Sequence, residues 1–175
     1  MAKIDKETIN KLKSGAIKPS DLFNVTAQQY GAILMAGHTL FTEGRYDEAR
    51  QLFEGLATLD SKNPYIHGML GAIYQKMGQD EAAIARYSKA LSMYPNDINS
   101  LTNRGELLLK TGKMQEAASD LKKAIDLDSG KRHPAANRAR LLVVATAEAL
   151  KLAQEKGVDA VLDAKKRIDA QLGAA

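Results

Sequence analysis

The sequence predicts an all-α protein in which three helical hairpins stack into a superhelix, because the chain repeats itself three times. Gly37, Gly71 and Gly105 recur at one fixed step. A second glycine and an alanine recur at the same step. These two further sets are Gly44, Gly78 and Gly112, and Ala49, Ala83 and Ala117. A fixed period of this kind is typical of a solenoid, in which each repeat buries its apolar face only against its neighbours.

The step between successive copies equals the period of the tetratricopeptide repeat, about 34 residues. The residue types fit that repeat as well. The middle copy matches its pattern at Leu70, Gly71, Tyr74, Ala83, Tyr87, Ala90 and Pro95. In this copy we expect one helix from Pro64 to Met77 and a second from Asp80 to Met93. The sequence therefore predicts three repeats, over residues 30–63, 64–97 and 98–131.

The two sets of glycines have different expected roles. Gly71 and its equivalents lie within a helix, where glycine is about 1 kcal/mol less favourable than alanine. We therefore expect two helices to approach closely there, with Ala83 and its equivalents on the facing helix. Gly78 and its equivalents lie at the turn inside each hairpin, where a left-handed residue ends the first helix and glycine adopts that conformation at little cost. Pro64 and Pro95 mark helix boundaries.

A helical segment over residues 1–29 is predicted ahead of the strict repeat. Its apolar residues either cover the open end of the solenoid, as end repeats require, or form a contact between two copies of the chain. The contact residues would be Ile9, Leu12, Leu22 and Phe23. Thr26 and Gln29 fit a capping box, which predicts that the first repeat helix begins at Ala27.

Residues 132–175 are predicted to form capping helices at the other end. Pro134 suits the first position of a helix, which we expect to run to Lys156 and to end at Gly157. A further helix is predicted from Val158 to Leu172. We expect the first of these helices to dock onto the last repeat through Leu141, Leu142, Val144 and Ala145.

The composition argues against several classes of protein. The chain contains no cysteine, which leaves no disulfide framework and no thiol chemistry. Its three histidines are far apart in sequence and lack the spacing of metal ligands, so we expect no catalysis, no cofactor and no metal. No apolar run approaches the ~20 residues of a membrane span, and the first residues lack the apolar run of a signal peptide. We therefore expect no membrane association and a cytoplasmic location.

The net charge of +4 is unevenly distributed. Residues 30–130 hold eleven Lys and Arg against thirteen Asp and Glu, whereas residues 1–29 and 131–175 carry net charges of +2 and +4. A nucleic-acid-binding protein usually shows a basic stripe with interleaved aromatic residues. The run Lys165-Lys166-Arg167 is more typical of a solvated helix face, so we expect no nucleic-acid partner.

Functional residues are expected on the inner surface of the superhelix, which the first helix of each hairpin lines. This surface mixes apolar side chains with few charges, of both signs. Such a surface suits an extended peptide that inserts apolar side chains into pockets while polar groups bond its backbone. In the alternative interpretation, Phe41 and Tyr65 only pack between repeats. The predicted groove residues are Leu34, His38, Phe41, Tyr65, Ala72, Gln75, Lys76, Asn99, Thr102, Glu106 and Leu109.

Four segments of the chain resemble a known family. Residues 14–22 read SGAIKPSDL ahead of the repeats, where generic repeat proteins have no such segment. Within the repeats, EGRYDEA at 43–49, LDSKNP at 59–64 and GAIYQ at 71–75 match the first two hairpins of that family. The chain thereby resembles the tetratricopeptide chaperones of bacterial type III secretion that bind translocator proteins, the SycD/LcrH/IpgC/SicA group.

The resemblance implies a cytosolic chaperone that holds an extended segment of a hydrophobic translocator in its groove and keeps it soluble until export. It also implies that two copies of the chain form a homodimer through the N-terminal segment from Ile9 to Phe23. Leu34 and His38 depart from the aromatic types that the family often has at these positions. Two alternatives stay open: a general scaffold or adaptor in a bacterial protein complex, and a regulator that acts on a transcription factor.

Overall fold

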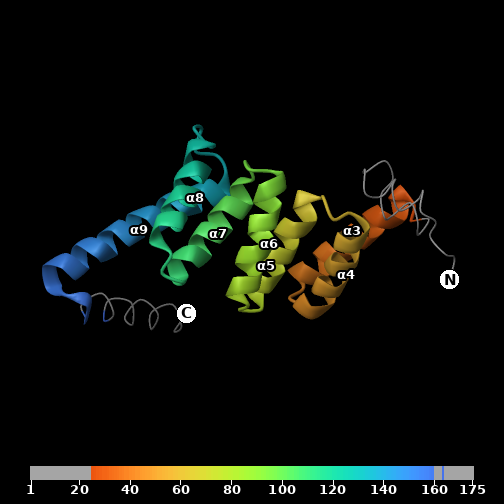
Figure 1. The fold of residues 1–175 in the computed structure, drawn as a ribbon, viewed down its shortest axis with the longest axis horizontal. Coiled ribbons are helices and arrows are strands. Elements are labelled where there is room, and N and C mark those ends of the chain that lie inside the picture. The colour runs from red at the N-terminus through yellow and green to blue at the C-terminus, as the bar shows by residue number, and fades with distance from the viewer. Residues whose placement is uncertain (1–24, 160–162, 164–175) are drawn as a thin grey trace, which may run out of the picture.

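The computed structural model describes residues 25–159 and residue 163, and this part of the chain is all-α, as predicted. Figure 1 shows the helices following one another along the long axis of the molecule, from α3 near one end to α9 near the other. The helices are α3 (Ala27–Thr42), α4 (Tyr46–Leu59), α5 (Pro64–Lys76), α6 (Asp80–Met93), α7 (Ile98–Lys110), α8 (Met114–Asp126) and α9 (Pro134–Lys156).

The helices α3 to α8 pair into three hairpins, and each hairpin packs on the next. The predicted bounds of α6 are confirmed, and α5 ends one residue earlier than predicted because Met77 is its C-cap. The glycines at the hairpin turns are also confirmed: Gly44, Gly78 and Gly112 have φ angles of 77°, 71° and 78°. Only glycine adopts this left-handed region without steric cost.

The helix-interior glycines make room for large side chains. A Cβ on Gly71 would lie 2.6 Å from the ring of Tyr87, and one on Gly37 would lie 2.8 Å from the ring of Phe53. In the third hairpin the predicted alanine, Ala117, does approach Gly105, with its carbonyl oxygen 3.5 Å from the Cβ position, but the group nearest to Gly71 is Tyr87 and not Ala83. The facing group is the bulky side chain one helical turn after that alanine, because Tyr87 points back across the helix pair.

The start of α3 and both ends of α9 lie at the residues that the sequence predicted. Thr26 and Gln29 form a reciprocal capping box: the Gln29 backbone N–H donates to Thr26 Oγ1 at 3.2 Å, and the Thr26 backbone N–H donates to Gln29 Oε1 at 2.9 Å. Pro134 is the first residue of α9, and Gly157 ends the helix after Lys156. Side-chain caps at helix starts typically contribute ~1 kcal/mol each.

The core runs along the interior of the superhelix. One cluster joins the first and second hairpins, with Phe53, Leu56, Ile66, Leu70 and Ile73 at its centre. Further along, a second cluster joins the third hairpin to α9. It includes the fully buried Leu121, Ala124 and Ala139. The core is therefore shared between neighbouring repeats.

The docking of α9 differs from the prediction. Its buried face is made by Ala135, Ala136 and Ala139, with the half-buried Leu142 beside them. Leu141, Val144 and Ala145 are exposed instead, with 70% of Leu141 and 54% of Val144 accessible. The alanines form the buried face because their small side chains let α9 lie close against α7 and α8.

Several predictions fall on residues outside the described part of the chain. The contact residues Ile9, Leu12, Leu22 and Phe23 lie there, so the choice between end cap and dimer contact stays a prediction. Of the predicted helix from Val158 to Leu172, only Val158, Asp159 and Asp163 are described, and all three are helical. None of the described helices is long and apolar enough to cross a membrane.

Candidate functional site

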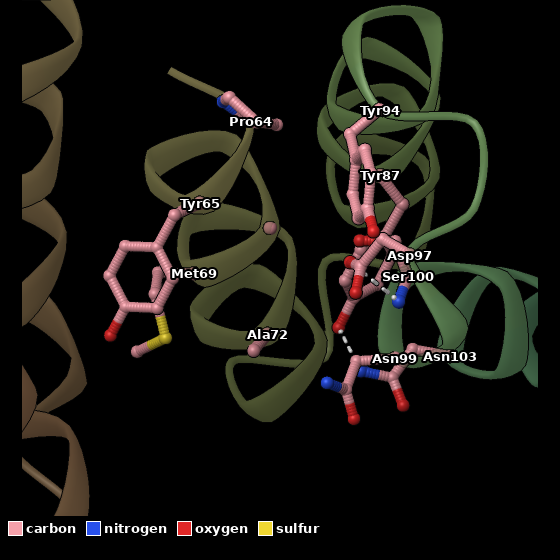
Figure 2. Close-up of a pocket in the computed structure, with 11 residues that line it drawn as sticks. Pro64, Tyr65, Met69, Ala72, Tyr87, Tyr94, Asp97, Asn99, Ser100 and Asn103 are labelled. Carbon is pink, nitrogen blue, oxygen red and sulfur yellow. Dashed lines mark hydrogen bonds between the residues drawn. The ribbon is translucent and has the colours of Figure 1, made fainter. Parts of the chain in front are cut away.

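An open pocket of about 420 Å³ lies between α5 and α7, next to the end of α6. Figure 2 shows the apolar side chains of α5 on one side and the polar side chains of α7 on the other. The lining residues are Pro64, Tyr65, Gly68, Met69, Ala72, Tyr87, Tyr94, Asp97, Asn99, Ser100 and Asn103.

The apolar side of the pocket depends on the rigid start of α5. Asn63 caps this helix by accepting the Tyr65 backbone N–H at 3.1 Å, and Pro64 is its first residue. Tyr65 is 50% exposed and Met69 is half-buried, so both present apolar surface that the protein itself leaves uncovered. Gly68 keeps the floor open, because a Cβ there would lie 3.4 Å from Ser100 Oγ.

The polar side is the first turn of α7. Asp97 is the N-cap, and its carboxylate accepts the Ser100 backbone N–H at 3.1 Å. The Ser100 hydroxyl is buried and has no hydrogen-bond partner among the described residues. Asn99 is exposed and Asn103 is half-buried. Both amides can donate and accept hydrogen bonds.

A chain of side-chain hydrogen bonds runs beneath the pocket and joins four helices. Arg138 of α9 donates to Asn103 Oδ1, and Asn103 Nδ2 donates to the Tyr87 hydroxyl at 2.9 Å. Tyr87 in turn donates to Gln75 Oε1 at 2.9 Å. Arg138 also faces Glu106, with Nε 3.6 Å from Oε2. Burial raises the pKa of the Tyr87 phenol far above its usual range, because the buried site disfavours the phenolate.

The predicted groove residues separate into three groups. Tyr65, Ala72 and Asn99 line the pocket. Gln75 and Glu106 belong to the polar chain beneath it. The remaining predicted residues lie outside the pocket lining: Leu34, His38, Phe41, Lys76, Thr102 and Leu109.

Most of this last group has a packing role. Leu34 and Phe41 pack against the core of the first two hairpins, with the rings of Phe41 and Tyr46 5.7 Å apart. Leu109 packs against the cluster that joins α7 to α9. Thr102 is fully buried and donates to the Ala135 carbonyl at 3.2 Å, so its placement in the groove is corrected.

Most residues of the site were not predicted from the sequence, among them Met69, Tyr94, Asp97, Asn103 and Arg138. In α7 the predicted set places Asn99 correctly in the pocket but includes the buried Thr102 in place of its neighbour Asn103. The repeat gave no signal for Asn103, because the equivalent residue one period earlier is Met69, which was itself not predicted. Thr102 likewise lies one period after Gly68, which lines the pocket without a side chain.

The three histidines have packing, solvent-facing or helix-capping roles, and His133 is the N-cap of α9, where its Nδ1 accepts the Ala135 backbone N–H at 3.2 Å. His67 is buried, with Nε2 3.0 Å from the Ser61 carbonyl. His38 is exposed on α3. Among the described residues, no group of His, Asp or Glu side chains is placed to hold a metal ion. What the pocket offers is recognition of a ligand that carries both apolar and hydrogen-bonding groups.

Comparison with known proteins places the chain first in a class and then in a family. Two tetratricopeptide-repeat models match it, over residues 40–103 and 98–131. The chain is 32% identical over 115 residues to the low calcium response locus protein H of Yersinia pseudotuberculosis, in a match that covers 66% of this chain and 67% of that protein. The chain therefore belongs to the tetratricopeptide chaperones of type III secretion, the group of LcrH and SycD.

Solved structures agree with this placement. A type III secretion complex from Aeromonas hydrophila superposes with a TM-score of 0.74 at 26% identity, over 82% of this chain and 98% of that one. The Yersinia enterocolitica chaperone SycD, in complex with a peptide of the translocator YopD, superposes with a TM-score of 0.64 at 28% identity. That match covers 75% of this chain and 98% of SycD.

Proposed function

We propose that the protein is a chaperone of type III secretion translocators. It holds an extended segment of its client in the pocket between α5 and α7 and keeps that client soluble in the bacterial cytoplasm before export. One observation carries the proposal: an open pocket with an apolar and a polar side lies on the repeats of a chain 28% identical to SycD, which is solved with a translocator peptide. The function is binding, without a catalytic step.

The two sides of the pocket suit the two parts of an extended peptide. An apolar client side chain can lie against Tyr65, Met69 and Ala72. Full burial of one leucine-sized side chain contributes about 1.5–3 kcal/mol. The amides of Asn99 and Asn103 face the same space and can bond the peptide backbone. A client segment held in this way loses the exposed apolar surface through which it would aggregate.

The charges near the pocket favour an apolar segment over an acidic peptide terminus. Recognition of acidic motifs relies on clustered basic side chains. Here Ala72 is apolar, and the charged residue that lines the pocket is the acidic Asp97. We therefore favour a translocator segment over the acidic tails that many tetratricopeptide adaptors bind.

Co-expression with the translocators encoded in the same genome tests the proposal. We expect one translocator to stay soluble and to co-purify in a stoichiometric complex. The double variant Tyr65→Ala/Met69→Ala should lose this complex while its helical circular dichroism stays unchanged. Met114→Ala is the matched control, because Met114 is 49% exposed on α8 and lies outside the pocket lining. Equal recovery of the complex with the double variant would place the client elsewhere.

A further inference from the structure

Arg138 reaches from α9 to the polar side of the pocket, although α9 contributes no lining residue. Its guanidinium donates to Asn103 Oδ1 and is itself held beside Glu106, at 3.6 Å. Asn103 lines the pocket directly. The helix that closes the last repeat is therefore connected to the candidate site through one side chain.

The charge of Arg138 determines which way the Asn103 amide points. A guanidinium only donates hydrogen bonds, so the amide oxygen must face it. The amide nitrogen then faces Tyr87 and donates to the phenol oxygen at 2.9 Å, as the dashed line in Figure 2 shows. The phenol proton is consequently directed to Gln75 Oε1, at 2.9 Å. Every bond in this chain runs in one direction, and Arg138 stands at its donor end.

This order leaves one N–H of Asn103 unused. An amide nitrogen carries two donors, and Tyr87 takes one of them. No other hydrogen bond to this nitrogen forms among residues 25–159. With the amide turned over, the pocket would instead present an oxygen, which repels a peptide carbonyl.

We infer that Arg138 is a positioning residue for client recognition: it fixes the Asn103 amide so that its second N–H faces the pocket and bonds a backbone carbonyl of an extended client. The inference rests on the proposed function and adds to it a named donor and the residue that orients it. It also gives α9 a role beyond covering the last repeat. Without Arg138, the amide oxygen can rotate toward the Tyr87 hydroxyl, and the donor is lost.

The binding test uses the full chain and a fluorescent synthetic copy of the YopD peptide. Arg138→Met removes the donors while keeping the length of the side chain, and Asn103→Asp keeps the shape while removing the N–H. Each should weaken binding about tenfold, as expected for one hydrogen bond whose partner stays desolvated. The double variant should be no weaker than either single one, and Arg138→Lys should recover part of the affinity. Arg132→Met, at an exposed arginine just before α9, is the matched control and should bind like wild type.

A second readout separates orientation from simple loss of stability. In ¹⁵N-labelled wild-type protein, one side-chain amide proton of Asn103 should show a nuclear Overhauser effect to the Tyr87 ring. That effect should vanish in Arg138→Met, while its melting temperature stays within a few degrees of wild type. Wild-type affinity in Arg138→Met, or an unchanged effect, overturns the role of Arg138 alone. Failure of the wild-type chain to bind the peptide or any translocator overturns the proposed function as well.

Discussion

Tyr87 occupies the space that a side chain on Gly71 would need. Two ring carbons of Tyr87 lie 2.6 Å from the position of a Cβ on Gly71, a distance that real Cβ contacts do not reach. Gly71 is buried on α5, and Tyr87 is 1% exposed on α6. The same pairing recurs in the other two hairpins, as Gly37 with Phe53 and Gly105 with Leu121. Each repeat thus packs a large side chain of its second helix against a glycine of its first helix.

Gly71→Ala should destabilise the protein, although alanine is the better helix former. The added methyl group must displace the Tyr87 ring, and overpacking of this kind costs typically about 1–3 kcal/mol. The free energy of unfolding from urea titration measures the loss. Gly55→Ala is the control, because no atom lies within 4 Å of its Cβ position on α4. It should stabilise by about 0.5–1 kcal/mol through helix propensity. Equal changes at both glycines would contradict the packing argument.

Asp120→Ala should be among the more damaging single polar substitutions. The carboxylate accepts two bonds from Arg104, at 2.7 and 2.8 Å, and its side chain is 9% exposed. Its removal leaves Arg104 with Ser88 as its remaining partner among the described residues. We expect a loss of about 2–3 kcal/mol, below the ~3–5 kcal/mol of a fully buried pair, because Arg104 is partly exposed.

The double variant Arg104→Leu/Asp120→Leu checks the cause of that loss. It should be more stable than Asp120→Ala, since no unpaired charge remains in the protein. Lys122→Ala breaks the exposed pair with Asp126 and should leave the urea midpoint unchanged. A double variant less stable than Asp120→Ala would show that packing, and not the lone charge, sets the effect.

Tyr87 should make the protein less stable at high pH. Burial raises the pKa of its phenol in the folded state, so the unfolded state, with a pKa near 10, releases its proton first. The contribution of the Tyr87 phenol to the free energy of unfolding is therefore fully present below about pH 10. It is lost as the pH rises above that value, by ~1.4 kcal/mol per pH unit. Urea titrations of wild type and Tyr87→Phe between about pH 9 and 11 should diverge in slope. Parallel curves would assign the alkaline loss to other groups.

Much of the fold could be predicted from the sequence because small residues at a fixed spacing mark each repeat. The start of α3 at its capping box and both ends of α9 were predicted to the residue. These signals are local: a cap, a proline or a left-handed glycine acts on its own helix end. The faces of α9 were harder to predict, because alanines and larger apolar residues occur all around it and only packing selects Ala139 over Leu141.

The pocket was predicted less completely than the fold for a related reason. Tyr65, Ala72 and Asn99 were found because the first helix of each hairpin lines the inner surface. Asn103 was missed through a shift of one residue, which rotates a helical position by about 100° and exchanges a pocket residue for the buried Thr102. Arg138 lies on a different helix and reaches the site only in three dimensions, so no spacing in the sequence indicates it.

Gly68→Leu should block the proposed client site without unfolding the protein. Gly68 lies at the pocket floor, where a Cβ would come within 3.4 Å of Ser100 Oγ and a longer side chain would extend into the open volume. We expect at least a tenfold loss of affinity for a translocator peptide, with a urea midpoint no lower than that of wild type, because leucine is the better helix former. Gly55→Leu, which adds the same side chain in open space on α4, should bind normally. Full affinity in Gly68→Leu would exclude this pocket as the client site.

Ala139→Leu should detach α9 from the repeats. Ala139 lies one repeat period after Gly105 and is fully buried beside Leu121 and Ala124. A leucine there cannot be accommodated without moving α9, at a cost of about 1–3 kcal/mol. Amide hydrogen exchange should therefore accelerate in α9 while protection in α5 and α6 is retained. Leu141→Ala, at a side chain 70% exposed on the opposite face, should leave exchange unchanged. Because Arg138 lies next to Ala139, the Ala139→Leu variant should also lose affinity for the peptide. Affinity retained while exchange in α9 is accelerated would show that peptide binding does not depend on α9.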